Sequence, residues 1–169
     1  MKSSAFVAAL RHSRLAGLAA LVVLGSAGSA HAATANSSMA VSATVQATCS
    51  ITANPLAFGT YNSGQLDAAT TLAVSCTNTT NYSVGLDAGS GSGATVATRK
   101  MANGGQTLNY AVYSDAARSA LWGATVGTNT VAGTGIGASQ TINVYGRIPA
   151  GQLPTPGSYT DTVTATITY

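Results

Sequence analysis

The sequence predicts an all-β protein, namely an incomplete immunoglobulin-like antiparallel β-sandwich that is completed by a donor strand. Three observations support the β-sandwich. Helical periodicity is almost absent, short segments alternate apolar and polar residues between glycine, proline and asparagine turn signals, and threonine, valine and tyrosine are abundant. Segments with one apolar and one polar face form two sheets that pack over a shared core.

The first residues predict a secretory signal peptide over residues 1–32. Met1 to Arg14 carries basic side chains, Leu15 to Gly28 is almost wholly apolar or small, and Ala30-His31-Ala32 has the spacing of a cleavage site. The alternative is a membrane anchor, but the apolar run is shorter than the roughly 20 residues that a spanning helix needs. We therefore expect a secreted mature chain that begins at Ala33 and has no integral membrane segment after cleavage.

The charges of the predicted mature chain balance, although the whole sequence has a formal net charge of +3. The excess lies in the leader. The mature basic residues are Arg99, Lys100, Arg118 and Arg147, and the mature acidic residues are Asp67, Asp87, Asp115 and Asp161. A neutral domain offers no basic face, so we expect neither nucleic acid nor an anionic membrane as a partner. Because charge helps to keep β-domains apart, the composition favours a domain that associates.

The mature chain also lacks the side chains that most catalysis needs. Both histidines lie in the leader, and glutamate is absent. A Ser-His-Asp triad is therefore impossible, and two cysteines alone cannot form a zinc site. We predict a non-enzymatic protein without metal or cofactor, whose aspartates are solvated loop carboxylates or, for Asp115, contact Arg118. Trp122 either packs in the sandwich or, in a monomeric carbohydrate-binding protein, stacks on a sugar.

The segments follow one another between turn signals. Odd-numbered residues from Met39 to Ile51 are apolar or small, and the predicted strands lie near residues 47–53, 70–76, 81–87, 107–113, 140–148 and 159–169. Residues 114–120 are expected to form a short helical turn, and residues 127–138 a long loop or weak hairpin. Cys49 and Cys76 are predicted to form a disulfide because the chain is exported and the count is even. The alternative is two free, buried thiols.

The two ends of the mature chain suggest how the domain associates. An immunoglobulin-like sandwich normally has seven strands, so the six segments of residues 47–169 would leave a groove along the core. The N-terminal extension, residues 33–46, has one apolar face formed by Met39, Val41, Ala43 and Val45. It is either a donor strand for a neighbouring subunit or the seventh strand of its own sandwich, and periodicity leaves both open.

Several motifs resemble one family over nearly the whole mature chain. They are Ala47-Thr48-Cys49-Ser50-Ile51, Phe58-Gly59-Thr60-Tyr61, Val74-Ser75-Cys76, Leu108-Asn109-Tyr110, Tyr113 to Arg118, Leu121-Trp122-Gly123, Tyr145 to Pro149, and Gly157 to Tyr169. In these motifs the chain resembles the spore coat protein U domain family, which includes pilin subunits of archaic (Csu-type) chaperone–usher fimbriae.

The resemblance implies a structural fimbrial subunit with three kinds of partner: a periplasmic chaperone, an outer-membrane usher, and identical or related pilin subunits. It implies that Val163, Ala165, Ile167 and Tyr169 form the acceptor groove and chaperone-facing strand, and that residues 33–46 replace the chaperone in the neighbour. The expected setting is the periplasm and then a cell-surface fimbrium that serves attachment and biofilm formation. A spore-coat or other surface-layer role is the alternative within the family.

Overall fold

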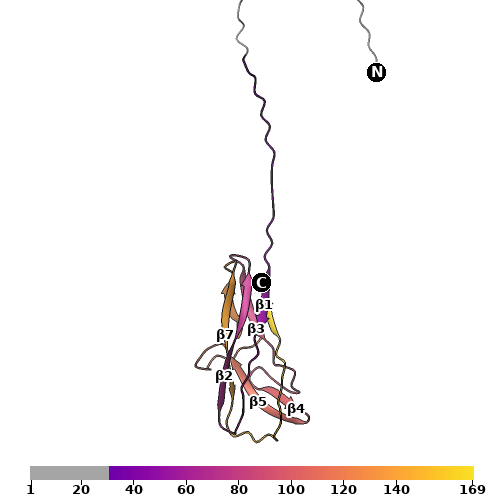
Figure 1. Cartoon of the computed structure of the whole chain (residues 1–169), viewed down its shortest axis with the longest axis vertical. Coiled ribbons are helices and arrows are strands. Elements are labelled where there is room, and N and C mark those ends of the chain that lie inside the picture. The colour runs from indigo at the N-terminus through magenta and orange to yellow at the C-terminus, as the bar shows by residue number, and fades with distance from the viewer. Residues whose placement is uncertain (1–30) are drawn as a thin grey trace, which may run out of the picture. The chain divides into compact units, whose positions relative to one another are not determined.

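The structure, a computed structural model, describes residues 31–169 (Figure 1). The predicted signal peptide, residues 1–32, lies outside the described residues except for His31 and Ala32. The chain divides into a segment that ends at Ser42 and a β-domain, Ala43–Tyr169, which are described separately below. Residues 31–169 contain no helix and therefore no helix that could span a membrane, and the predicted all-β fold is confirmed.

The strands form two antiparallel sheets in the β-domain. They are β1 (Cys49–Ala53), β2 (Leu66–Cys76), β3 (Asn81–Leu86), β4 (Arg99–Asn103), β5 (Gln106–Tyr113), β6 (Val131–Thr134), β7 (Ser139–Ile148) and β8 (Ala165–Thr168). The larger sheet has the order β1-β2-β7-β5-β4, and the smaller has the order β6-β3-β8. The long pair β2 and β7 runs through the larger sheet (Figure 1), with Leu66 opposite Ile148 and Ser75 opposite Ser139.

The alternation that predicts these strands also builds the core. In β2 the side chains of Leu72, Val74 and Cys76 are buried, whereas Ser75 is exposed. The buried cluster draws on both sheets and contains Leu72, Val74, Cys76, Tyr82, Val84, Leu86, Leu108, Tyr110, Val112, Trp122, Val144 and Ile148. Burial of apolar surface at about 25 cal/mol per Å² makes this layer the main source of stability.

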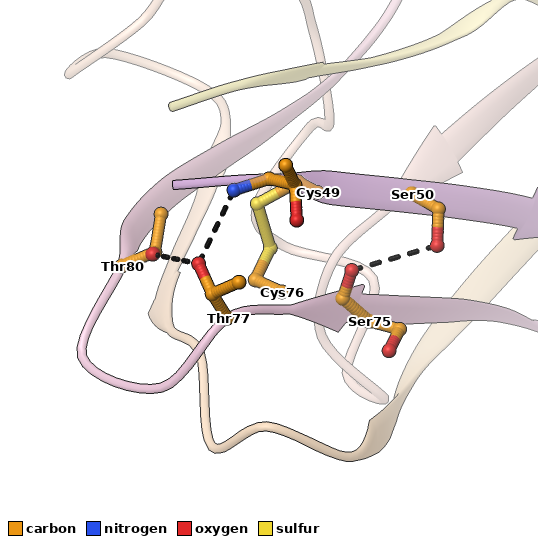
Figure 2. Close-up of a disulfide and its surroundings, with 7 residues drawn as sticks. Cys49, Ser50, Ser75, Cys76, Thr77 and Thr80 are labelled. Atoms are coloured by element: carbon orange, nitrogen blue, oxygen red, sulfur yellow. Dashed lines mark hydrogen bonds between the residues drawn. A yellow bond between two sulfur atoms is a disulfide. The ribbon is translucent and has the colours of Figure 1, made fainter. Parts of the chain in front are cut away.

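The predicted disulfide is confirmed. Cys49 lies directly opposite Cys76 in the register of β1 and β2, and their sulfur atoms are bonded. Figure 2 shows the bond between the two strands, with Thr77 and Thr80 hydrogen bonded beside it. The bond fixes the first strand to the sheet at the point where ladder pairing begins.

The sequence prediction missed some elements and misjudged others. β4 was not predicted because its first side chain, Arg99, is buried and breaks the expected alternation. The loop or weak hairpin at residues 127–138 contains strand β6. Residues 114–120 form turns without a helix, and the last strand pairs only over Ala165–Thr168 instead of the predicted residues 159–169.

Candidate functional site: the open side of the sandwich

The two sheets are not joined along one side of the domain. β1 pairs only with β2, and β8 pairs only with β3, although β1 and β8 lie side by side. Beyond Ala53 the chain leaves the ladder, and before Ala165 only the bridge from Thr160 to Ala102 is formed. The side of the sandwich is therefore open between residues 53–58 and residues 159–165.

A groove of about 450 Å³ occupies this opening. Its floor is the apolar core of both sheets, and its rims come from the chain after β1 and before β8. The lining residues include Leu56, Phe58, Leu72, Leu86, Met101, Tyr110, Val112, Val144, Tyr159, Asp161, Val163 and Ala165. The ring of Phe58 packs edge-on against that of Tyr110, with centroids 5.8 Å apart. Phe58 also lies close to β7 because Gly146 has no side chain, and a Cβ there would come within 2.6 Å of its ring.

The segment from Thr160 to Thr168, here called the groove wall, has one face on the core. Val163, Ala165 and Ile167 are half-buried and pack against the core, whereas the intervening threonines are exposed. Tyr169 lies outside this contact and is 59% exposed. No hydrogen bond from another residue of the described range reaches the main chain of Asp161 or Val163. The wall therefore presents unpaired main-chain groups along the groove, which is the arrangement that an additional strand needs.

Two carboxylates hold the wall where the ladder is missing. Asp161 Oδ1 accepts hydrogen bonds from Ser90 N, Ser90 Oγ and Thr162 N, and its Oδ2 accepts one from Tyr110 Oη at 2.7 Å. Asp87 Oδ1 accepts from Thr164 N and Gly89 N, each at 2.9 Å. Both carboxylates lie outside the strands, but they are half-buried and hydrogen bonded to segments distant in the sequence, so their interpretation as solvated loop carboxylates was wrong.

The hydrogen bonds also determine the titration of these groups. Burial alone would raise the pKa of Asp161, but the hydrogen bonds from Tyr110 and Ser90 outweigh burial and hold its pKa below the usual value. The same balance applies to Asp87, where backbone donors from Thr164 and Gly89 overcome burial and lower the pKa. Burial and the Asp161 carboxylate raise the pKa of the Tyr110 hydroxyl far above its usual value. At neutral pH Asp87 and Asp161 are therefore ionised carboxylates, and Tyr110 is a neutral phenol.

Arg99 is hydrogen bonded to the main chain of Asp87, one of these two aspartates. Its side chain is fully buried, and it donates to four backbone carbonyls: Asp87 O at 2.8 Å, Val96 O at 3.1 Å, Leu86 O at 3.2 Å and Trp122 O at 2.7 Å. Burial lowers the pKa of Arg99, while Tyr110 and the two carboxylates oppose this shift. Sequence reasoning did not single out Arg99. No sequence signal distinguished it, because the neighbouring Lys100 carries the same charge and is only half-buried.

Trp122 does not lie at a binding surface. Its side chain is fully buried, and the indole Nε1 donates to Val84 O at 2.9 Å. A sugar cannot stack on this ring without disruption of the core. Asp115 also differs from the expectation, because its carboxylate accepts from Ser119 and Ala120 while the Arg118 guanidinium reaches Asp67.

The predicted donor residues are exposed. Residues 31–48 form no strand, and Met39, Val41 and Val45 are 83%, 82% and 88% exposed. Ala43 is exposed as well. The structure thus places Val163 and Ala165 in the lining of the groove, whereas Ile167 packs against the core without lining it. No residue of the extension occupies a ladder position. The donor and acceptor roles themselves remain predictions.

Residues 31–169 contain no group of three or more His, Cys, Asp or Glu side chains placed to hold a metal ion. The site is instead an apolar groove with a main-chain edge. Such a surface can bind a β-strand, because main-chain hydrogen bonds provide affinity and alternate side chains provide register.

The fold and groove define a β-sandwich with an open edge, and comparison with known proteins identifies its family. The Spore Coat Protein U domain model matches residues 35–166, and the chain belongs to this family. Protein U of Myxococcus xanthus is 36% identical over 158 residues, which cover 83% of this chain and 88% of that protein. The family resemblance expected from the sequence is confirmed.

A solved structure supports the fold. It is described as the CsuC–CsuE chaperone–tip adhesion subunit pre-assembly complex from archaic chaperone–usher Csu pili of Acinetobacter baumannii. One of its chains matches with a TM-score of 0.57 and 20% identity over 75% of this chain and 41% of that chain. This chain therefore spans less than half the length of the matched chain, and the likeness concerns the fold alone.

Proposed function

We propose that this protein is a structural subunit of a surface fibre, which polymerises by donor-strand exchange through a chaperone–usher pathway. The observation that carries the proposal is the open groove, whose wall has an apolar face and an unpaired main-chain edge. The chain supplies a segment of matching character, because residues 33–46 alternate apolar and polar side chains and form no strand in the described structure.

Burial of the donor face in a groove of this kind would be energetically favourable. Met39, Val41 and Val45 are more than four-fifths exposed. Their burial would contribute on the order of 5 kcal/mol. Main-chain hydrogen bonds to the wall would add to this figure and fix the direction of the inserted strand. A subunit whose groove is empty exposes apolar surface, so we propose a periplasmic chaperone that covers it before an outer-membrane usher passes the subunit to the fibre.

Family and fold support this assignment. The chain belongs to the Spore Coat Protein U domain family, and its fold resembles a chain from a chaperone–subunit complex of an archaic pilus. We propose that the protein is not an enzyme and that it acts at the cell surface in attachment and biofilm formation. The second candidate function is a structural protein of a spore coat or surface layer, which the description of the matching family, Spore Coat Protein U domain, favours. Strand exchange between subunits is compatible with either setting.

The donor face can be tested by single substitutions in the mature chain. Val41→Asp places a carboxylate on the apolar face, and we expect it to abolish assembly because burial of an unpaired charge costs several kcal/mol. Ser42→Asp is the matched control, since it adds the same charge to the opposite face one residue away. Oligomer size is measured by size-exclusion chromatography with light scattering. Equal assembly by both variants would show that the donor face is wrongly assigned.

The acceptor side is tested with a complementary pair. Val163→Asp should block the groove wall while leaving the donor segment intact, and Thr166→Asp, on the exposed face of the wall and outside the groove lining, is its control. Val163→Asp and Val41→Asp should each remain monomeric, but their mixture should form one-to-one complexes, because one still donates and the other still accepts. A mixture that stays monomeric, while both chains keep wild-type circular dichroism, would contradict donor-strand exchange.

A further inference from the structure

The groove wall is held in an unusual way for a strand. Regular pairing with β3 begins only at Ala165, and Thr160 is the last bridged residue before it. Between them, Thr164 N donates to the side chain of Asp87 and Thr162 N to the side chain of Asp161. Over this part of the wall these side-chain acceptors accompany a single main-chain bond to the chain after β3, from Asp87 N to Thr164 O at 3.1 Å.

Asp161 joins three segments at this point. It belongs to the wall, it accepts two hydrogen bonds from Ser90 in the loop after β3, and it accepts one from Tyr110 on β5. Asp161 and Tyr110 both line the groove. The bond between them therefore spans from the wall to the larger sheet and sets their separation beside the cavity.

The surroundings of Asp161 are built to keep it there. Gly89 has a φ of +82°, and a Cβ on it would overlap the Asp161 carboxylate. Only glycine combines this left-handed backbone with the close approach. Tyr110 is itself fixed, since it is 5% exposed and its ring packs on Phe58. The carboxylate thus has little freedom to move away from the wall.

We propose that Asp161 is a positioning residue for strand uptake: it holds the groove wall in the extended form that an incoming strand pairs with. This inference rests on the proposed function. The hydrogen bonds of the Asp161 side chain with Ser90 and Tyr110 are here called the clamp. Because the clamp uses a side chain, the main chain of Asp161 and Val163 stays free for the incoming strand. Without the clamp, the incoming strand would have to order the wall itself, and this entropy cost would weaken binding.

The experiment measures strand binding in the full mature chain. Val41→Asp and Val45→Asp together disable its own donor face, so the chain serves as a receptor that cannot polymerise. The probe is a fluorescein-labelled peptide with the sequence of residues 33–48, and anisotropy gives its association and dissociation rates. Loss of one charge-assisted hydrogen bond corresponds to roughly a tenfold change in an equilibrium constant. We therefore expect Asp161→Asn to weaken peptide binding about tenfold.

Asp115→Asn is the matched control. Asp115 also accepts hydrogen bonds from its own turn, through Ser119 and Ala120, but it does not line the groove. The affinity of this variant for the peptide should stay within about twofold of that of the parent receptor, a difference smaller than the loss of one hydrogen bond would cause. Urea unfolding of both variants separates the effect on binding from the effect on stability.

Tyr110→Phe adds a second readout. It removes only the donor to Asp161 Oδ2 and keeps the ring in the core. It should produce part of the loss seen with Asp161→Asn, and the double variant should be no weaker than Asp161→Asn alone, because both changes break one clamp. Additive losses in the double variant would overturn the inference.

The outcomes separate this inference from the proposed function. If the parent receptor binds the peptide and Asp161→Asn binds it equally well, the positioning role is wrong while the proposed function stands. The same conclusion follows if Asp161→Asn and Asp115→Asn weaken binding equally. If the parent receptor binds no peptide, donor-strand exchange fails and the inference falls with it.

Discussion

Replacement of Arg99 tests whether the buried guanidinium organises the domain. The side chain is fully buried, and its four hydrogen bonds join the end of β3, the loop at Val96 and the main chain of Trp122. No carboxylate of the described residues contacts it directly. Arg99→Lys keeps the charge but offers its donors from a single atom, whereas Arg99→Met keeps similar apolar length and offers no donor.

The magnitudes follow from the bonds lost. A hydrogen bond to a charged group contributes about 1.5–3 kcal/mol, and bonds made by one side chain do not add fully. Lysine can recover part of the set, so we expect Arg99→Lys to lose about 2 kcal/mol of unfolding free energy. Arg99→Met leaves all four carbonyls without their donor, and we expect a loss of about 4 kcal/mol.

The assay is urea unfolding followed by fluorescence of Trp122, the only tryptophan. It uses the full mature chain with Val41→Asp and Val45→Asp, so that assembly does not contribute. With a slope of about 2 kcal/mol per molar urea, the midpoints should fall by about 1 M for lysine and about 2 M for methionine. If methionine were as stable as lysine, the carbonyl contacts would contribute little, and the reasoning would be refuted.

Two further predictions concern stability. The Cys49–Cys76 bond links residues separated by 27 positions, so its removal by alanine at both positions should cost about 3.5 kcal/mol on the chain-entropy model, measured by urea unfolding; an unchanged midpoint would contradict this. The folded pKa values of Asp87 and Asp161 are lowered, so their stabilisation is fully present above the unfolded pKa of about 3.9 and is lost as pH falls through the folded values. Acid titration of unfolding should therefore show a smaller loss for Asp161→Asn than for the parent chain, and an identical acid profile would count against the clamp.

Much of the β-domain was predictable because its strands obey a local rule. The period of two in β2, β5 and β7 places one face on the core, and the structure has strands close to the predicted ranges. The cysteine pair was predictable from its even count and the exported character of the chain. The short strand β4 was not, because a buried arginine is the opposite of the residue that a buried position normally carries.

The candidate site divides in the same way. Alternation identified the apolar face of Val163, Ala165 and Ile167, since that pattern is local. It could not show that regular pairing stops at Ala165 or that Asp87 and Asp161 accept hydrogen bonds beside that point, because these contacts join residues more than 70 positions apart. Such contacts depend on the folding of both sheets and leave no periodic signal.

The sequence by itself determined the class of fold, the disulfide and the family, because these depend on residue type, local period and motifs. Only the tertiary structure decided that the sandwich is open between β1 and the segment before β8, and that Tyr110 and Asp161 are hydrogen bonded to each other in the lining of that opening. The physical reason is that a groove is a property of packed sheets. Its shape depends on where strand pairing ends and on hydrogen bonds between residues that are distant in the sequence.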